Sequence, residues 1–253
     1  GSDTVAGGKG SDTLTISVTG GIALNAVSQS GVTNVETIKF EGTGNIAAAY
    51  TLADATFNTT GVAATGGTGA DLAIVGTVDG SGMTGDGALT FTGTAEDDSV
   101  INITGGRGGD FLYGGQKADT IDGGDGGDTI DGDAGIDVLT GGSGNDTFQV
   151  SNATSGTDFI GLTSTETVDG GAGTDTLDFT TGAPTVAAAD LLGMSSIEKI
   201  AFSTTGAVDL TIADNVFAAN GSTTLKIEDS ENSAAFTFSA AGVSAANSVK
   251  VYI

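Results

Sequence analysis

Apolar and polar residues alternate in short runs along most of this 253-residue chain, which is the pattern of half-buried β-strands. Clear examples are Leu14-Ile16-Val18, Val208-Leu210-Ile212, Phe236-Phe238 and Val249-Val251-Ile253. Gly, Asn and Ser separate the runs, so we expect many short strands. Helical signals are brief, as in residues 187–192. The pattern therefore predicts an all-β fold.

A nine-residue repeat runs without a gap from residue 105 to residue 149. Its five copies read GGRGGDFLY, GGQKADTID, GGDGGDTID, GDAGIDVLT and GGSGNDTFQ. The sixth position is always aspartate: Asp110, Asp119, Asp128, Asp137 and Asp146. The eighth is always large and apolar: Leu112, Ile121, Ile130, Leu139 and Phe148. Isolated copies begin at Gly7 and Gly170, and weaker ones at Gly66 and Gly93. Such a period predicts a structure built from stacked, near-identical units.

Each repeat combines a cation-binding turn with a short strand. Paired glycines permit positive φ, so that backbone carbonyls can turn toward an ion, and the aspartate adds a charged oxygen. The three residues that follow, such as 129–131, predict a short strand with its central side chain buried. Because the chain has no His and no Cys, any metal must be held by oxygen, which favours calcium. The predicted ligands are Asp12, Asp110, Asp119, Asp128, Asp137, Asp146 and Asp175, with Gly106, Gly108, Gly124, Gly126, Gly142, Gly144, Gly171 and Gly173.

The consensus G-G-x-G-x-D-x-U-x resembles the calcium-binding nonapeptide repeat of RTX proteins. The contiguous match covers about a fifth of the chain. The resemblance implies a parallel β-roll that binds several Ca²⁺ ions, with two nonapeptides in each coil. Asp110, Asp128 and Asp146 should then line one edge, and Asp119 and Asp137 the other. Stacked coils lie about 4.8 Å apart, so consecutive carboxylates on one edge could share a cation.

The same charges predict that the roll depends on its ions. Two carboxylates about 5 Å apart repel each other by roughly 3 kcal/mol at an effective dielectric constant of 20. We therefore expect the roll to be disordered without calcium and to fold on binding it. Affinities of about 10⁻⁴ to 10⁻³ M are typical of extracellular calcium modules. Lys117 and Asp133 replace glycines of the consensus, so their two turns are expected to bind less well.

A longer repeat encloses the roll. GGKGSDTL at Gly7 and VETIKF at Val35 match GGAGTDTL at Gly170 and IEKIAF at Ile197, and TLADATF matches TIADNVF further on. We interpret these as two copies of one β-rich module, forming a β-solenoid or irregular β-sandwich that continues from the roll. The expected divisions are residues 1–92, 93–178 with a core at 105–149, and 179–253. Both ends resemble cuts, so we expect a fragment of a longer chain whose second module is truncated.

Composition excludes several classes of function. The chain has 7 basic and 32 acidic residues, a net charge of −25, which argues against binding nucleic acid or an anionic membrane. Without His there is no HExxH metalloprotease motif and no His-dependent triad. No GxSxG nucleophile elbow is present, no apolar run could span a membrane, and no signal peptide is visible. We therefore expect no enzyme and no membrane insertion.

Six other acidic positions are candidates for sites outside the repeat. Glu36 and Glu198 stand at matching positions and leave a carboxylate-only glycosidase open. We favour strand-surface residues paired with Lys39 and Lys199. Asp97 and Asp98, with Asp79 and Asp86, could form a further cation site, although a solvated acidic loop is the favoured interpretation.

The Thr-, Ser- and Ala-rich flanks resemble the C-terminal regions of RTX-type bacterial surface-layer proteins. That resemblance implies type I secretion, a cell-surface location and self-association into a lattice. It also allows contact with cell-surface polysaccharide through regions outside this chain. The alternatives are the RTX region of a large adhesin or of a secreted polysaccharide-active enzyme.

Overall fold

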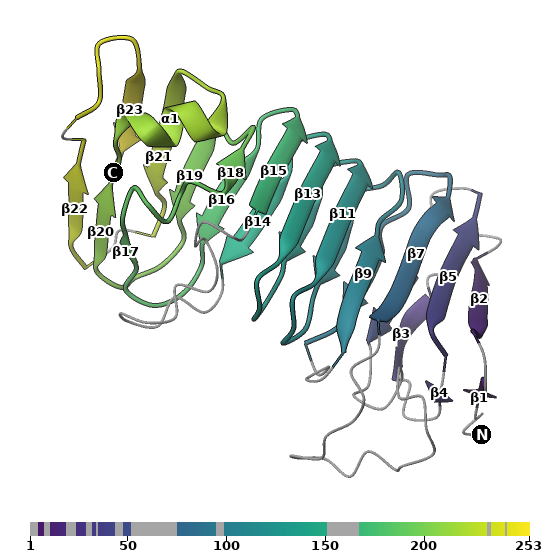
Figure 1. The fold of residues 1–253 in the computed structure, drawn as a ribbon. Coiled ribbons are helices and arrows are strands. Elements are labelled where there is room, and N and C mark those ends of the chain that lie inside the picture. Colours follow the sequence, from purple (N-terminus) through teal and green to yellow (C-terminus); the bar gives the residue numbers. More distant parts are fainter. Residues whose placement is uncertain are drawn as a thin grey trace.

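The strands stack in parallel as a two-sheeted solenoid (Figure 1). The computed structural model describes residues 5–7, 11–18, 24–28, 32–33, 35–43, 48–51, 75–94, 99–150, 167–231, 234–240 and 242–253. One sheet contains, in spatial order, β23 (Ser248–Tyr252), β21 (Thr224–Asp229), β19 (Lys199–Phe202), β16 (Thr176–Phe179), β14 (Thr147–Val150), β12 (Thr129–Asp131), β10 (Phe111–Tyr113), β8 (Leu89–Thr92), β6 (Ala48–Thr51) and β3 (Leu24–Ser28). This sheet is called the ten-stranded sheet below.

The second large sheet, the eight-stranded sheet, faces the first across the core. It contains β18 (Met194–Ser195), β15 (Thr167–Ala172), β13 (Val138–Ser143), β11 (Thr120–Asp125), β9 (Val100–Thr104), β7 (Val75–Met83), β5 (Thr37–Gly42) and β2 (Thr13–Val18). Two smaller sheets comprise β17 (Thr185–Val186), β20 (Val208–Thr211) and β22 (Phe236–Ser239), and β1 (Val5–Ala6) and β4 (Val32–Thr33). The expected all-β fold with a parallel roll is confirmed, and both large sheets extend beyond the roll into the flanking segments.

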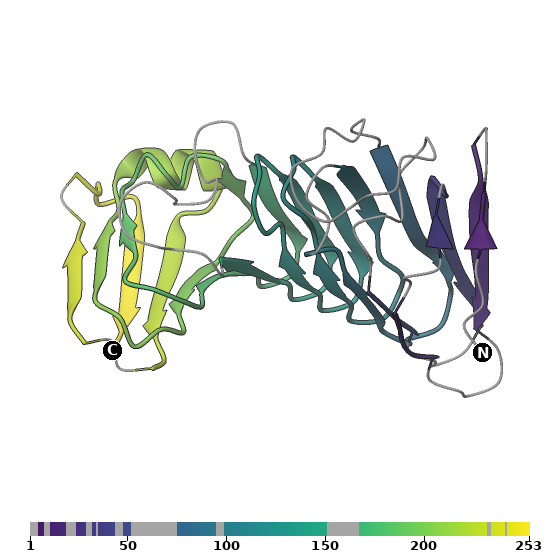
Figure 2. The same cartoon turned by 90° about the horizontal axis from the view of Figure 1, so that it is seen from below.

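The nine-residue repeat sets the length of the central coils. Leu112 lies opposite Ile130, and Ile130 lies opposite Phe148, so one coil takes 18 residues. The next step, from Phe148 to Leu177, takes 29 residues. Coils grow where the repeat stops, and Figure 2 shows the wider coils at the C-terminal end.

One apolar side chain from each short strand fills the interior of the roll. The residues at the eighth repeat position are all buried: Leu112, Ile121, Ile130, Leu139 and Phe148. The flanking coils bury larger aromatic clusters. Tyr50 packs edge-on against Phe40 and stacks on Phe91, and Phe179 stacks on Phe202 with ring centroids 5.1 Å apart. The roll therefore has a thinner apolar core than its flanks.

Helical structure lies elsewhere than predicted. Residues 187–192, expected as a brief helix, form turns in which Asp190 accepts the N–H of Ala187 and donates its own N–H to the Ala187 carbonyl. In the described part of the chain, the one α-helix is α1 (Asp214–Asn220), which begins in the segment TIADNVF (211–217) expected to belong to a β-rich module. Val216 and Phe217 of this helix are buried in the core. Among the described residues, no helix is long and apolar enough to cross a membrane.

Candidate metal centre

The repeat aspartates form two hydrogen-bonded columns, one along each edge of the roll. On the first edge, Oδ1 of Asp128 accepts the N–H of Asp110 at 2.7 Å, and Oδ1 of Asp146 accepts the N–H of Asp128 at 2.8 Å. Oδ1 of Asp175 extends this column by accepting the N–H of Asp146. On the second edge, Oδ1 of Asp137 accepts the N–H of Asp119 at 2.8 Å. The structure thus has the two-edge arrangement that the resemblance to RTX repeats implies.

The second carboxylate oxygen, Oδ2, divides the six repeat turns into two kinds. In the turns that begin at Gly105 and Gly114, the N–H of the second residue donates to Oδ2 of Asp110 or Asp119 at 2.6 Å. We call these the closed turns. In the turns that begin at Gly123, Gly132, Gly141 and Gly170, Oδ2 is buried and has no hydrogen-bond partner; these atoms belong to Asp128, Asp137, Asp146 and Asp175. We call these the open turns.

Backbone conformation explains the difference. In each open turn the second and fourth residues have positive φ: Gly124 and Gly126, Asp133 and Gly135, Gly142 and Gly144, and Gly171 and Gly173. Gly106 and Gly108, in the first closed turn, do not have positive φ. Asp133 takes the left-handed conformation with φ 61°, so the turn in which it replaces glycine keeps the open form. The turn containing Lys117 is closed, as shown by the Gly115 N–H bond to Asp119.

In three of the four open turns, the first glycine lies against both the unpartnered oxygen and a backbone carbonyl oxygen. A β-carbon on Gly123 would lie 2.3 Å from Oδ2 of Asp128 and 2.5 Å from the carbonyl oxygen of Gly141. A β-carbon on Gly141 would lie 2.3 Å from Oδ2 of Asp146 and 2.6 Å from the carbonyl oxygen of Gly170. A buried carboxylate oxygen without a donor and a carbonyl oxygen therefore lie on the same side of these glycines. This donor set fits a hard cation such as Ca²⁺.

Burial makes these carboxylates unfavourable as bare anions. It raises the pKa of Asp110 and Asp119 to about 6, and that of Asp128 and Asp137 to about 7. It also raises the pKa of Asp146 and Asp175. An isolated buried charge is costly, whereas a cation at Oδ2 would favour the ionised form.

The aspartates predicted as ligands do not all lie in the same kind of turn. The structure brings Asp128, Asp137, Asp146 and Asp175 beside open turns, whereas Asp110 and Asp119 lie in closed turns. Oδ2 of Asp12 is likewise buried without a partner, although residues 8–10 of its turn lie outside the described part. The carbonyls of Gly141 and Gly170, each the first glycine of the next turn on the same edge, lie beside the glycines that flank these oxygens, and the sequence prediction did not include them. The glycine that opens these repeat copies was the available signal.

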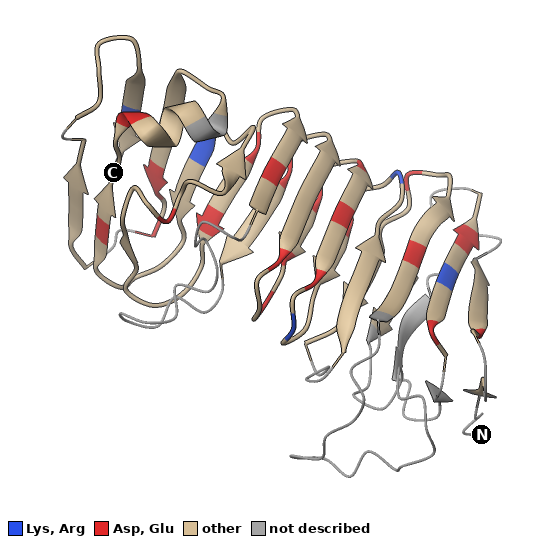
Figure 3. Ribbon diagram, viewed as in Figure 1, with Lys and Arg blue, Asp and Glu red and all other residues tan. Residues whose placement is uncertain are grey.

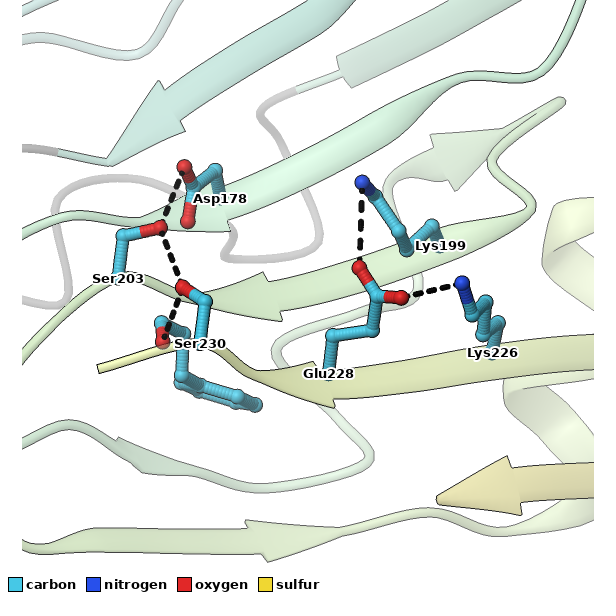
Figure 4. Close-up of polar contacts among 7 residues, drawn as sticks. Asp178, Lys199, Ser203, Lys226, Glu228 and Ser230 are labelled. Carbon is cyan, nitrogen blue, oxygen red and sulfur yellow. Dashed lines mark hydrogen bonds and ion pairs between the residues drawn. The ribbon is translucent and has the colours of Figure 1, made fainter. Parts of the chain in front are cut away.

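Two other predictions concern acidic residues outside the repeat. The expected pairs of Glu36 with Lys39 and of Glu198 with Lys199 are wrong. Lys39 pairs with Glu41 at 2.7 Å, and Lys199 pairs with Glu228, which also binds Lys226 (Figure 4). Lys39 and Glu41 lie two residues apart on β5, whereas Lys199 and Glu228 lie on neighbouring strands whose pairing the linear sequence does not specify. Of the second proposed acidic cluster, Asp97 and Asp98 lie outside the described residues, as does the weak repeat at Gly66.

Acidic side chains recur along successive coils, and basic ones are few (Figure 3). Within the described residues, no three carboxylates converge on one point. A cation there would be held by one or two carboxylates together with backbone carbonyls, as the glycine turns allow.

Comparison with known families gives one result. The family described as RTX calcium-binding nonapeptide repeat matches in four copies, at residues 1–15, 104–139, 122–150 and 167–186. No curated protein and no solved structure matches the chain significantly. The matched segments include every open turn and the turn of Asp12.

Proposed function

We propose that this chain, an RTX protein whose repeats bind calcium, is a structural module of a secreted bacterial surface-layer protein, folded by calcium and assembled with copies of itself. The observation that carries the calcium role is the row of buried carboxylate oxygens without donors in the open turns. RTX repeats are typical of secreted proteins, where millimolar calcium would fill sites of modest affinity. A chain without cysteine is suited to secretion in an unfolded state, followed by folding outside the cell.

Self-association is supported by apolar side chains on the outside of the roll. Ile136 and Val138 are 52% and 45% exposed, and they flank the buried Asp137 on the second edge. Calcium at this edge would both order these residues and reduce the negative charge around them. Repulsion between copies of a chain with a net charge of −25 would fall at the same time.

The open turns give a first prediction about the sites themselves. Asp128→Asn should weaken calcium binding more than Asp119→Asn, because Oδ2 of Asp119 is already bonded to the N–H of Gly115 and that of Asp128 is not. Isothermal titration with calcium measures both variants against the parent chain. Equal losses in the two variants would contradict the assignment of calcium to the open turns.

Assembly gives a second prediction. Light scattering should rise when calcium is added to the chain, and Ile136→Ser combined with Val138→Ser should reduce the rise without changing calcium binding. Both residues are exposed, so the double variant is expected to fold. A chain that binds calcium and stays monomeric at every concentration would contradict the assembly role. It would favour the RTX region of an adhesin or of a secreted polysaccharide-active enzyme.

A further inference from the structure

Two glutamates outside the nonapeptides occupy the next position of an aspartate column. Oε2 of Glu198 accepts the N–H of Asp175 at 2.9 Å, and Oε2 of Glu36 accepts the N–H of Asp12 at 2.7 Å. Each glutamate also donates its own N–H to the carbonyl of that aspartate, at 3.1 and 3.2 Å. Both lie beyond the segments that match the repeat family. The same arrangement therefore occurs twice, once in each copy of the long repeat.

Each glutamate faces an aspartate with an unsatisfied oxygen. Oδ2 of Asp175 and Oδ2 of Asp12 are buried and have no hydrogen-bond partner, and the Asp175 residue as a whole is 0% exposed. In each pair, a buried carboxylate oxygen without a donor lies beside a second carboxylate, an arrangement that a bound cation would satisfy.

The turn that follows Asp175 supplies a carbonyl without being a repeat. A β-carbon on Gly170 would lie 2.0 Å from the carbonyl oxygen of Ser196 and 2.7 Å from Oδ2 of Asp175. In the preceding coil, Gly141 stands in the same relation to the carbonyl of Gly170 and to Asp146. Ser196 is in the left-handed region, with φ 54°. The carbonyl of Ser196 thus lies where the carbonyl of Gly170 lies in the preceding coil, although Gly170 itself does not have positive φ.

We infer that Asp175, the carbonyl of Ser196 and Glu198 form a further calcium site, and that Asp12 and Glu36 contribute to its counterpart in the first module. The inference rests on the proposed calcium function and adds ligands outside the nonapeptides. Carboxylate and carbonyl oxygens are the donors that Ca²⁺ prefers. Glu198 uses Oε2 for the Asp175 N–H, and its other oxygen is left for the ion.

The position suggests what this ion does. Thr176 and Lys199, which follow the two acidic residues, lie opposite each other where β16 meets β19. This is the junction between the repeat coils and the longer C-terminal coils. An ion held by both sides would tie the calcium-dependent roll to the flanking solenoid.

The test is to count bound ions in Glu198→Gln. Glutamine keeps an oxygen that can accept the Asp175 N–H but removes the charge. Equilibrium dialysis, at the free calcium concentration that just saturates the parent chain, should give one ion fewer for E198Q. The double variant E36Q/E198Q should lose two. The matched control is E228Q, which removes the same charge from the adjacent strand β21, where Glu228 pairs with lysines, and should keep the full count.

The outcomes separate this inference from the function on which it rests. A parent chain that binds no calcium would refute the proposed function. A parent chain that binds calcium, with E198Q at the full count, would overturn only the further site. If E198Q lost its β-sheet spectrum in saturating calcium, E36Q would replace it, and a full count in folded E36Q would likewise overturn the inference.

Discussion

Gly144→Ala is expected to destabilise the calcium-loaded chain by at least about 3 kcal/mol. Gly144 has φ 136°, a conformation in which a β-carbon is strained, and that carbon would lie 1.5 Å from the carbonyl oxygen of Gly126. The clash cannot be relieved by rotating a side chain, because the neighbour is backbone. Gly126 is itself fixed by donating its N–H to Ser143 at 2.7 Å. Urea unfolding in saturating calcium measures the loss.

Gly221→Ala is the matched control. Gly221 also has positive φ, 73°, but a β-carbon there meets nothing within 4 Å. It ends α1, where alanine should cost about 1 kcal/mol through backbone strain alone. Equal losses in the two variants would show that the close stacking of the glycine turns contributes nothing to stability.

The central coils could be predicted from the sequence in detail because each repeat copy fixes the same local structure. Aspartate at the sixth position and an apolar residue at the eighth determine which side chain lies at the edge and which in the core. Ile121 and Asp128, for example, are both buried as the pattern requires. Two nonapeptides per coil, a number that the resemblance to RTX repeats implied, then place alternate aspartates on opposite edges.

The distinction between open and closed turns could not be predicted in this way. Gly106 and Gly124 occupy the same repeat position, yet only Gly124 has positive φ. The N–H of Gly106 instead donates a hydrogen bond to Oδ2 of Asp110. The repeat consensus alone therefore does not specify whether a turn is open or closed.

The flanks were predictable as strands but not in their contacts. The partner of Lys199 is Glu228 rather than Glu198 because register between long coils decides which side chains meet. Glu36 and Glu198, which stand at matching positions in the sequence, each accept the N–H of an aspartate, Asp12 or Asp175. The pair Asp12 and Glu36 lies beside β5 in the eight-stranded sheet. The pair Asp175 and Glu198 lies beside β19 in the ten-stranded sheet.

Removing calcium is expected to unfold the roll, residues 99–150, while part of the flanking structure remains. All five aspartates of the contiguous repeat are at most 1% exposed. Without a cation, their ionised forms are buried and repel their neighbours in the column. The roll offsets this with one apolar side chain per nonapeptide. The flanks have larger aromatic clusters, such as Phe179 with Phe202, and fewer buried charges.

Far-ultraviolet circular dichroism of EDTA-treated chain, titrated with calcium and in parallel with magnesium, tests the central claim that calcium folds the roll. Magnesium is the control because it requires a smaller, more regular oxygen shell and gives up its water reluctantly. The account predicts a cooperative gain of β-sheet signal with calcium alone. A β-sheet spectrum of full amplitude in EDTA that calcium leaves unchanged would contradict it.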